Sequence, residues 1–185
     1  EEVGSRESTE AIRRLARIAD RAFVLEPPLG LDGKLKTARK GLGRFTLTVH
    51  GKAAHAGLDP EKGANAIVEM ARLVQQLYAL NDFETGTTVN VGLIEGGISP
   101  NTIAPHSRVV LDVRVPTRAE GERVEAVIRS LKTEAEGVRL EIEGGFGRPP
   151  MEPTPRNQQL WTLAAKTGRA LGIELEQASA GGGSD

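Results

Sequence analysis

The stretch RFTLTVHGKAAHAGLDPEKGANAIVEMARLVQQLYAL, residues 44–80, decides the fold. Apolar and polar side chains alternate over its first seven residues, which is typical of a half-buried strand; the apolar face carries Phe45, Leu47 and Val49. A loop follows, and then Asp59 is a candidate cap with Pro60 at the first helical position. The helical stripe behind them comprises Ile67, Met70, Ala71, Val74, Leu77 and Tyr78. We therefore expect a strand followed by the longest helix of the chain.

The same two patterns continue toward the C-terminus. Residues 87–94, 107–115 and 138–143 alternate as strands do. Between the last two, TRAE at residues 117–120 has the form of a capping box, and the stripe behind it contains Val124, Val127, Ile128 and Leu131. The order of elements over residues 44–143 is thus β-α-β-β-α-β. This order predicts an α+β domain of the ferredoxin-like type, with two helices covering one sheet.

The two flanks are too small to form cores of their own. Residues 8–22 predict a helix and AFVLEPP, residues 22–28, a strand, while a second helix begins at Thr154 and Pro155 and precedes the strand-like IELEQA. We expect residues 1–43 and 148–185 to pair as two pieces of an incomplete α/β domain, with residues 44–147 inserted between them. Both ends of the chain read as cuts, so we expect a segment of a longer protein.

Composition excludes several classes of protein. The chain has 24 Lys+Arg against 25 Asp+Glu and only 3% aromatic residues, which argues against a nucleic-acid partner. It has no cysteine, so a metal would need His, Asp and Glu ligands. No apolar run approaches the ~20 residues that a bilayer requires, so we expect no membrane partner. The expected location is cytoplasmic, although a segment of a longer protein would not show a secretory signal.

Three carboxylates could carry chemistry. Glu1 and Glu2 are adjacent; at a strand end, one could ligate a metal while the other takes a proton from metal-bound water. Glu26 offers a third carboxylate. Three acids without a histidine favour a hard cation, so zinc would need imidazole ligands from elsewhere.

The histidines allow two interpretations. Small residues surround His55, so a ligand or another chain could approach its ring closely, but an ordinary loop histidine fits the local sequence as well. His50, on the polar face of its strand, and His106, in a loop, are typical surface histidines. A metal pair of His50 and His55 is conceivable, but its spacing is not diagnostic.

The cationic and amide candidates lie in the middle and at the edges of the chain. Arg114 lies in mid-strand opposite its apolar neighbours, either solvated or able to bind a carboxylate through two N–H groups. Asn101, Arg148 and Lys34 lie in expected loops or breaks and would each be taken for a surface residue. The final GGGSD, residues 181–185, could be a turn or an anion-binding backbone nest.

Taken in order, these segments resemble the dinuclear zinc metallopeptidases that include glutamate carboxypeptidase, acetylornithine deacetylase, succinyl-diaminopimelate desuccinylase and aminoacylase. The glutamate carboxypeptidases are the nearest in appearance. The resemblance covers the whole chain through EEVGSRES, VLEPP, KL, VHGKAAHAGLDPEKGANAIVEMARLV, SPNTIAPHSRVVLDVRV, GRPP and GGGSD. Each segment alone is weak, but the series is specific.

The resemblance implies roles for the candidates. Glu1 matches the general base, and Glu2 and Glu26 match ligands of two zinc ions. His55 is similar to a lid histidine that acts across a homodimer and stabilises an oxyanion. The residues similar to those that hold the terminal carboxylate of the substrate are Asn101, Arg114, Arg148 and, nearby, Lys34.

The implied activity is hydrolysis of an amide bond in a small peptide or N-acyl amino acid, with release of a C-terminal amino acid such as glutamate. Other ligands of the family have no counterpart between Glu1 and Asp185, so we expect the segment itself to be inactive and to hold zinc partially or not at all. The alternative is a non-enzymatic ferredoxin-like module that dimerises or binds a regulatory small molecule. An RNA-binding domain of this fold is disfavoured by the charge and the few aromatic residues.

Overall fold

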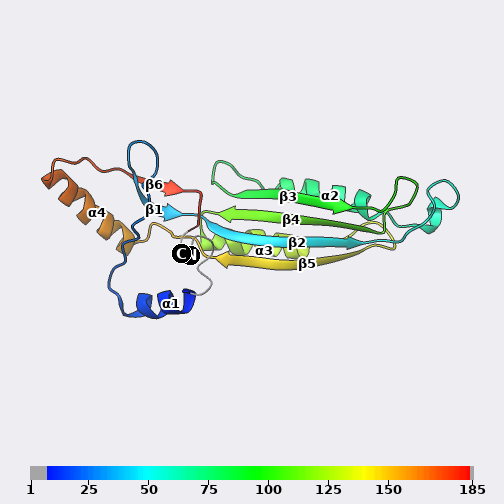
Figure 1. The fold of residues 1–185 in the computed structure, drawn as a ribbon, viewed down its shortest axis with the longest axis horizontal. Coiled ribbons are helices and arrows are strands. Elements are labelled where there is room, and N and C mark those ends of the chain that lie inside the picture. Colours follow the sequence, from blue (N-terminus) through cyan, green and yellow to red (C-terminus); the bar gives the residue numbers. More distant parts are fainter. Residues whose placement is uncertain (1–7, 184–185) are drawn as a thin grey trace. The chain divides into compact units, whose positions relative to one another are not determined.

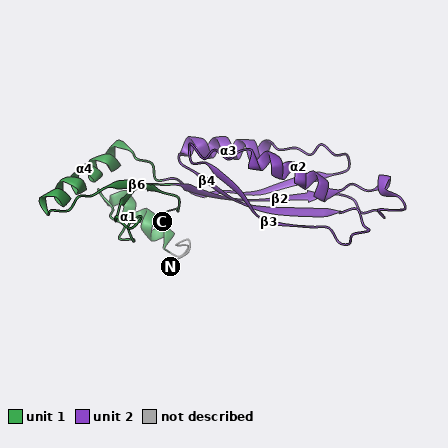
Figure 2. Ribbon diagram, turned by 90° about the horizontal axis from the view of Figure 1, so that it is seen from above, with its two compact units in different colours: residues 1–39, 151–185 green, residues 40–150 purple. Residues whose placement is uncertain are grey.

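The structure is a computed structural model that describes residues 8–183. It divides into two compact units, one formed by Lys40–Pro150 and the other by Glu1–Arg39 with Met151–Asp185 (Figure 2).

The Lys40–Pro150 unit is a four-stranded sheet with two helices. Its elements are β2 (Gly41–His50), α2 (Ala66–Tyr78), β3 (Thr88–Gly96), β4 (His106–Val115), α3 (Arg118–Ser130) and β5 (Arg139–Arg148). The strands lie in the order β3-β4-β2-β5, and all neighbours are antiparallel (Figure 1). Both helices lie on one side of the sheet (Figure 2). The predicted ferredoxin-like α+β fold is therefore confirmed.

The core lies between the sheet and the two helices. The alternation read from the sequence places one set of side chains from β2 and β4 on the helix-facing side, where α2 and α3 complete the cluster. Its central members are Phe45, Leu47, Val49, Met70, Leu73, Leu77, Val109, Leu111, Val113, Val115, Val124 and Ile128. The other face of the sheet carries the alternate residues, which are mostly polar.

The helix expected after Asp59 begins later than predicted. Pro60–Lys62 forms only a short 3-10 turn, η1, and α2 starts at Ala66. Its cap is Asn65, whose Oδ1 accepts hydrogen bonds from the amides of Ile67 and Val68 at 3.0 and 3.3 Å. The backbone is extended at Gly63, which interrupts the helix. The α2 helix thus has 13 residues, and α4 with 16 is longer, so the prediction of the longest helix was wrong.

The apolar residues predicted to form one stripe on α2 lie in two rows, one buried and one more exposed. Met70 and Leu77 are buried in the core together with Leu73, whereas Ile67 is 42% and Tyr78 64% exposed. Ala71 and Val74 complete this second row, because residues three and four apart lie on one side of a helix. We call Ile67, Ala71, Val74 and Tyr78 the outer stripe.

The other unit is built from both flanks. Its elements are α1 (Thr9–Ile18), β1 (Leu35–Arg39), α4 (Pro155–Ala170) and β6 (Gln177–Ala180). Strands β1 and β6 pair in parallel, with Leu35 opposite Gln177. The two flanks therefore pair with each other, as the sequence predicts.

Two predictions about the flanks were wrong. Residues 22–28 form no strand; Val24 and Leu25 are exposed, and a strand needs a hydrogen-bonded partner as well as suitable side chains. The strand forms instead from the polar residues 35–39. The boundaries expected at 43/44 and 147/148 fall inside β2 and β5. Glycines at the ends of both strands carry no side chain, so the alternation there is invisible in the sequence.

Candidate functional site

His55 and Asn101 lie on two loop segments that pair side by side. The amide of Ala56 donates to the carbonyl oxygen of Asn101 at 2.9 Å, and the amide of Ile103 donates to the carbonyl oxygen of Ala54 at 2.9 Å. His55 lies opposite Thr102 in this short antiparallel bridge. The loops that follow β2 and β3 thus bring two predicted site residues together.

The His55 ring is exposed and has one defined hydrogen bond. Its Nδ1 accepts from the amide of Gly57 at 3.1 Å. Because an accepting nitrogen carries no hydrogen, the neutral ring has its hydrogen on Nε2. Within residues 8–183, no side chain or backbone group is hydrogen-bonded to that Nε2. The ring therefore presents an N–H donor to an outside acceptor.

Asn101 offers a second donor in the same place. Its Oδ1 accepts a hydrogen bond from the hydroxyl of Ser99 at 2.6 Å, which assigns the NH₂ group as the outward end of the amide. Asn101 is exposed, like His55. Each of the two side chains thus presents a hydrogen-bond donor suited to an anionic or carbonyl oxygen.

Arg114 and Arg148 form a second pair at the other end of the sheet. Both are register partners of Leu42, Arg114 on β4 and Arg148 on β5, so they flank Leu42 on the face away from the helices. Asp112 holds the Arg114 guanidinium, with 2.8 Å between Nε and Oδ1. Arg148 was expected in a break of the chain, but it is the last residue of β5.

The two pairs are far apart within one copy. Leu42, next to both arginines, and His50, near the His55 loop, are separated by eight steps along β2. At about 3.3 Å per residue, that separation is about 26 Å. A single small substrate cannot contact His55 and Arg114 of the same chain at once.

Glu26 and Lys34 lie in the other unit. The Oε2 of Glu26 accepts from Arg39 Nη1 at 2.7 Å and lies 3.8 Å from Lys36 Nζ. Arg39 also donates through Nε to the carbonyl oxygen of Gly182 at 3.0 Å, so it connects Glu26 with the C-terminal glycine run.

Lys34, in the N-terminal flank, forms an ion pair with a residue of the C-terminal flank. Its Nζ lies 2.7 Å from Oε2 of Glu176. The hydrogen bond and the charge of Glu176 raise the pKa of Lys34, so its ammonium form is favoured. Lys34 is thus engaged by a carboxylate in this structure.

The remaining candidates are only partly described. Glu1 and Glu2 lie outside the described residues, as do the last two residues of the GGGSD run. His50 pairs with Glu141, with 3.0 Å between Nε2 and Oε2, and His106 begins β4 instead of lying in a loop. In the part of the chain that the structure describes, no three His, Cys, Asp or Glu side chains come together as a metal site.

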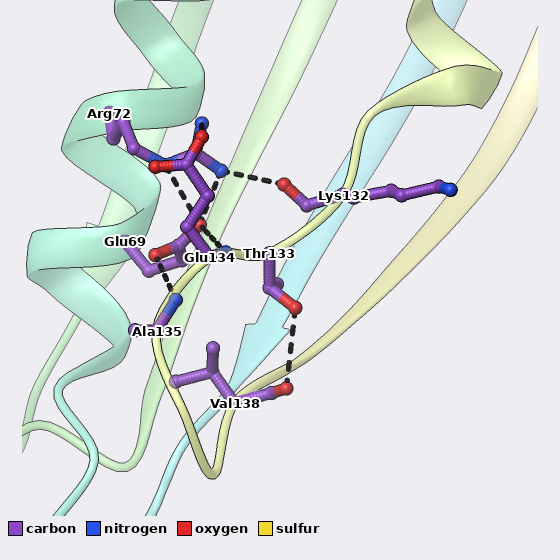
Figure 3. A network of polar contacts seen from close by, with 7 residues as sticks. All are labelled: Glu69, Arg72, Lys132, Thr133, Glu134, Ala135 and Val138. Atoms are coloured by element: carbon purple, nitrogen blue, oxygen red, sulfur yellow. Dashed lines mark hydrogen bonds and ion pairs between the residues drawn. The ribbon is translucent and has the colours of Figure 1, made fainter.

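Sequence reasoning missed a buried polar network that fastens α2 to the segment between α3 and β5 (Figure 3). Glu69 is only 3% exposed and accepts from the Nε of Arg72 at 3.0 Å and from the amides of Glu134 and Ala135 at 3.1 and 3.2 Å. Arg72 also donates to the carbonyl oxygen of Lys132 at 2.6 Å. Burial raises the pKa of Glu69, but these hydrogen bonds outweigh it and leave the pKa below its ordinary value. The only sequence signal was the i, i+3 spacing of Glu69 and Arg72.

Comparison with known proteins places these features in context. Residues 37–141 match the family described as the peptidase dimerisation domain. Carboxypeptidase G2 from Pseudomonas sp. (strain RS-16) is 29% identical over all of this chain and 45% of its own length. Acetylornithine deacetylase from Myxococcus xanthus is 31% identical over 72% of this chain and 37% of its own length.

A solved structure shows the same arrangement. Aminopeptidase PepT from Bacillus cereus superposes with a TM-score of 0.74 and 25% identity, over 96% of this chain and 49% of that one. The chain thus spans less than half the length of these relatives. None of the described helices is long and apolar enough to cross a bilayer.

Proposed function

The chain belongs to the peptidase dimerisation domain family, and on this premise we propose that it is the lid and dimerisation part of a zinc-dependent hydrolase, together with two pieces of the catalytic domain. We assign the Lys40–Pro150 unit as the lid, and Glu1–Arg39 with Met151–Asp185 as the catalytic pieces. The substrate is a small peptide or an N-acyl amino acid, and the product is a C-terminal amino acid such as glutamate. Relatives with the names carboxypeptidase and acetylornithine deacetylase support this class of amide hydrolysis.

The homodimer forms through the α2 and β3 side of the lid. Strand β3 is an edge of the four-stranded sheet, so its outer backbone groups can pair with another strand. The outer stripe of α2 lies next to it, since a Cβ on Gly97 would contact Ile67 at 3.2 Å. Leu93, Ile94 and Ile98 add exposed apolar surface. A second copy of the chain, docked edge to edge, would bury both features.

The distance between the two donor pairs is the observation that supports a site shared between two protomers. His55 and Asn101 lie beyond one end of β2, and Arg114 and Arg148 lie beside Leu42 near the other end, about 26 Å from His50 in one copy. If all four contact one substrate, they must come from two copies. We therefore assign His55 and Asn101 of one protomer to the site that contains Arg114 and Arg148 of the other.

We assign a role to each candidate side chain. The Nε2–H of His55 donates to the oxygen that becomes negative when the amide carbonyl is attacked. Arg114, Arg148 and Asn101 bind the terminal carboxylate of the substrate, and we assign Lys34 to the same task. Glu1 takes the proton of the attacking water.

We propose that the complete enzyme binds zinc. We assign Glu2 and Glu26 as ligands, but the described residues alone do not fit a zinc ion, because Glu26 is engaged by Arg39 and Lys36 and has no ligand cluster around it. The other ligands must come from residues outside 8–183, in this chain or beyond it.

The test is an assay of the complete protein of which we propose this chain is a segment. It should hydrolyse N-acyl glutamate or a dipeptide with a free C-terminal carboxylate, and a chelator should abolish the activity. Substrates with an amidated C-terminus should be poor. A complete protein that dimerises and binds zinc but hydrolyses none of these amides would support the non-enzymatic module instead.

A further inference from the structure

The turn that carries His55 is closed by its own backbone and by one carboxylate. The amides of Leu58 and Asp59 both donate to the carbonyl oxygen of His55 at 3.2 Å. In the opposite direction, the amide of His55 donates to Oδ1 of Asp59 at 3.2 Å. Asp59 therefore binds both backbone polar groups of His55, one through its main chain and one through its side chain.

Asp59 differs here from the cap that the sequence indicates. It occupies the N-cap position of η1, but its side chain makes no capping hydrogen bond to that turn. Oδ1 is directed to His55, and Oδ2 lies 3.3 Å from Nζ of Lys62. The carboxylate thus holds the histidine turn rather than the segment that follows it.

Gly57 supplies the contact that reaches the ring. Its amide donates to Nδ1 of His55 at 3.1 Å. A Cβ at this position would lie 3.7 Å or more from the ring, an ordinary contact, and the backbone there is not in the left-handed region. Space therefore does not require glycine here, and the N–H group is the feature that acts on His55.

The other side of the turn is anchored as well. Ala54 and Ala56, on either side of His55, are bonded to the backbone of Ile103 and Asn101 at 2.9 Å. With both neighbours fixed, the remaining freedom of His55 lies in its side chain, and the Gly57 amide restricts that.

We infer that the turn formed by residues 55–59 holds the His55 ring in one neutral tautomer, with Nδ1 as acceptor and Nε2 as donor, and that Asp59 is the positioning residue of this turn. The tautomer of His55 and the positioning role of Asp59 are inferred from these hydrogen bonds alone. Their consequence for turnover rests on the role proposed for His55. A fixed Nε2–H donor needs no rearrangement when the carbonyl oxygen becomes negative, which is the condition for stabilising that charge.

The structural part can be tested without activity. The chain has only three histidines, so ¹⁵N-labelled imidazoles can be resolved by NMR and assigned with His55→Ala. At about pH 8, the spectrum of the neutral His55 ring should show a bare Nδ1 and a protonated Nε2. A protonated Nδ1, or an average of the two tautomers, would overturn the inference.

Matched variants separate positioning from folding. Asp59→Ala should move both ring nitrogens of His55 toward the tautomer average, while Asp59→Asn, which keeps an oxygen acceptor, should resemble the parent. Gly57→Ala, which keeps the amide, and Lys62→Ala should also resemble it. Unchanged His50 and His106 signals would show an intact sheet. If Asp59→Ala leaves the His55 spectrum unchanged, Asp59 is not the positioning residue.

Turnover provides the second readout. In the complete enzyme, Asp59→Ala should lower kcat by about tenfold, below the hundredfold or more expected for loss of the donor itself, with KM little changed and activity restored by Asp59→Asn. Equal kcat for the alanine and parent enzymes would overturn the catalytic consequence. If His55→Ala itself leaves turnover unchanged, the proposed function of His55 fails, and the NMR result still decides the tautomer.

Discussion

Arg114 and the loop that carries His55 lie at opposite ends of one four-stranded sheet, and the β2 residues next to them, Leu42 and His50, are about 26 Å apart. The separation lies within a single compact unit, and the antiparallel register of β2 and β4 defines it. Two groups this far apart can contact one small substrate only when they come from different copies. The proposed active site therefore requires the dimer.

The first prediction concerns the dimer surface. Ile67→Asp should convert the dimer to a monomer, because it places a charge at the N-terminal end of the outer stripe, next to β3, which a second copy would bury. Light scattering after size exclusion measures the mass. Gln76→Asp is the matched control: it is exposed on the opposite side of α2 and should leave the dimer intact. If Ile67→Asp remains dimeric, the α2 and β3 side is not the interface.

The second prediction concerns the buried network of Figure 3. Glu69→Gln should reduce the free energy of unfolding by about 2–4 kcal/mol, because its NH₂ group would face the donating amide of Ala135 and Arg72 would lose the buried one of its two charged partners. Denaturant titration of both proteins measures the loss. A change within the range of ordinary surface substitutions would mean that the network contributes little.

The pH dependence of the same carboxylate is the third prediction. The folded-state pKa of Glu69 lies below its ordinary value of 4.5, so its contribution is complete above that pH and is lost as pH falls through the lower, folded-state pKa. The unfolding free energy of the parent should therefore fall more steeply below pH 4.5 than that of Glu69→Gln. Parallel curves in this range would contradict the assignment.

The fourth prediction separates substrate groups from metal ligands. In the complete enzyme, His55→Ala should reduce turnover by on the order of a hundredfold or more while bound zinc stays unchanged. Arg114→Lys should mainly raise KM, because an ammonium cannot reproduce a two-point contact with a carboxylate. Zinc content by elemental analysis is the control measurement. Loss of zinc on His55→Ala would make that histidine a ligand.

A fifth prediction concerns the chain as it stands. Calorimetry at neutral pH should detect no tight stoichiometric zinc site, because Glu26 is engaged by Arg39 and the described residues contain no ligand cluster. Two zinc ions bound with sub-micromolar dissociation constants would show that the ligand set assigned here is wrong.

Much of the Lys40–Pro150 unit could be predicted because its strands are half-buried. Alternation in residues 44–50 and 107–115 reports directly which side chains face the helices. The same rule failed for the flanks. Residues 22–28 have strand-forming side chains without a partner, whereas the polar residues 35–39 form β1 because β6 is available to pair with them.

The sequence suggests residues for the candidate site but does not show how they are arranged. His55 and Asn101 are far apart in sequence, and no local pattern shows that their loops pair through Ala56. Asp59 could be read only as a helix cap, since the sequence does not reveal that its carboxylate binds the His55 amide. The first contact depends on long-range backbone pairing, and the second depends on the geometry of the turn at residues 55–59. Neither follows from a periodic pattern in the sequence.

The composite site is tested most directly by mixing two impaired proteins. His55→Ala and Arg114→Ala protomers of the complete enzyme should each have low kcat/KM alone. After subunit exchange, half of the dimers are mixed and each mixed dimer has one site with both side chains intact, so about a quarter of the parent activity should return. A mixture that forms mixed dimers but is no more active than its components would contradict the assignment of His55 and Arg114 to one site shared between two copies.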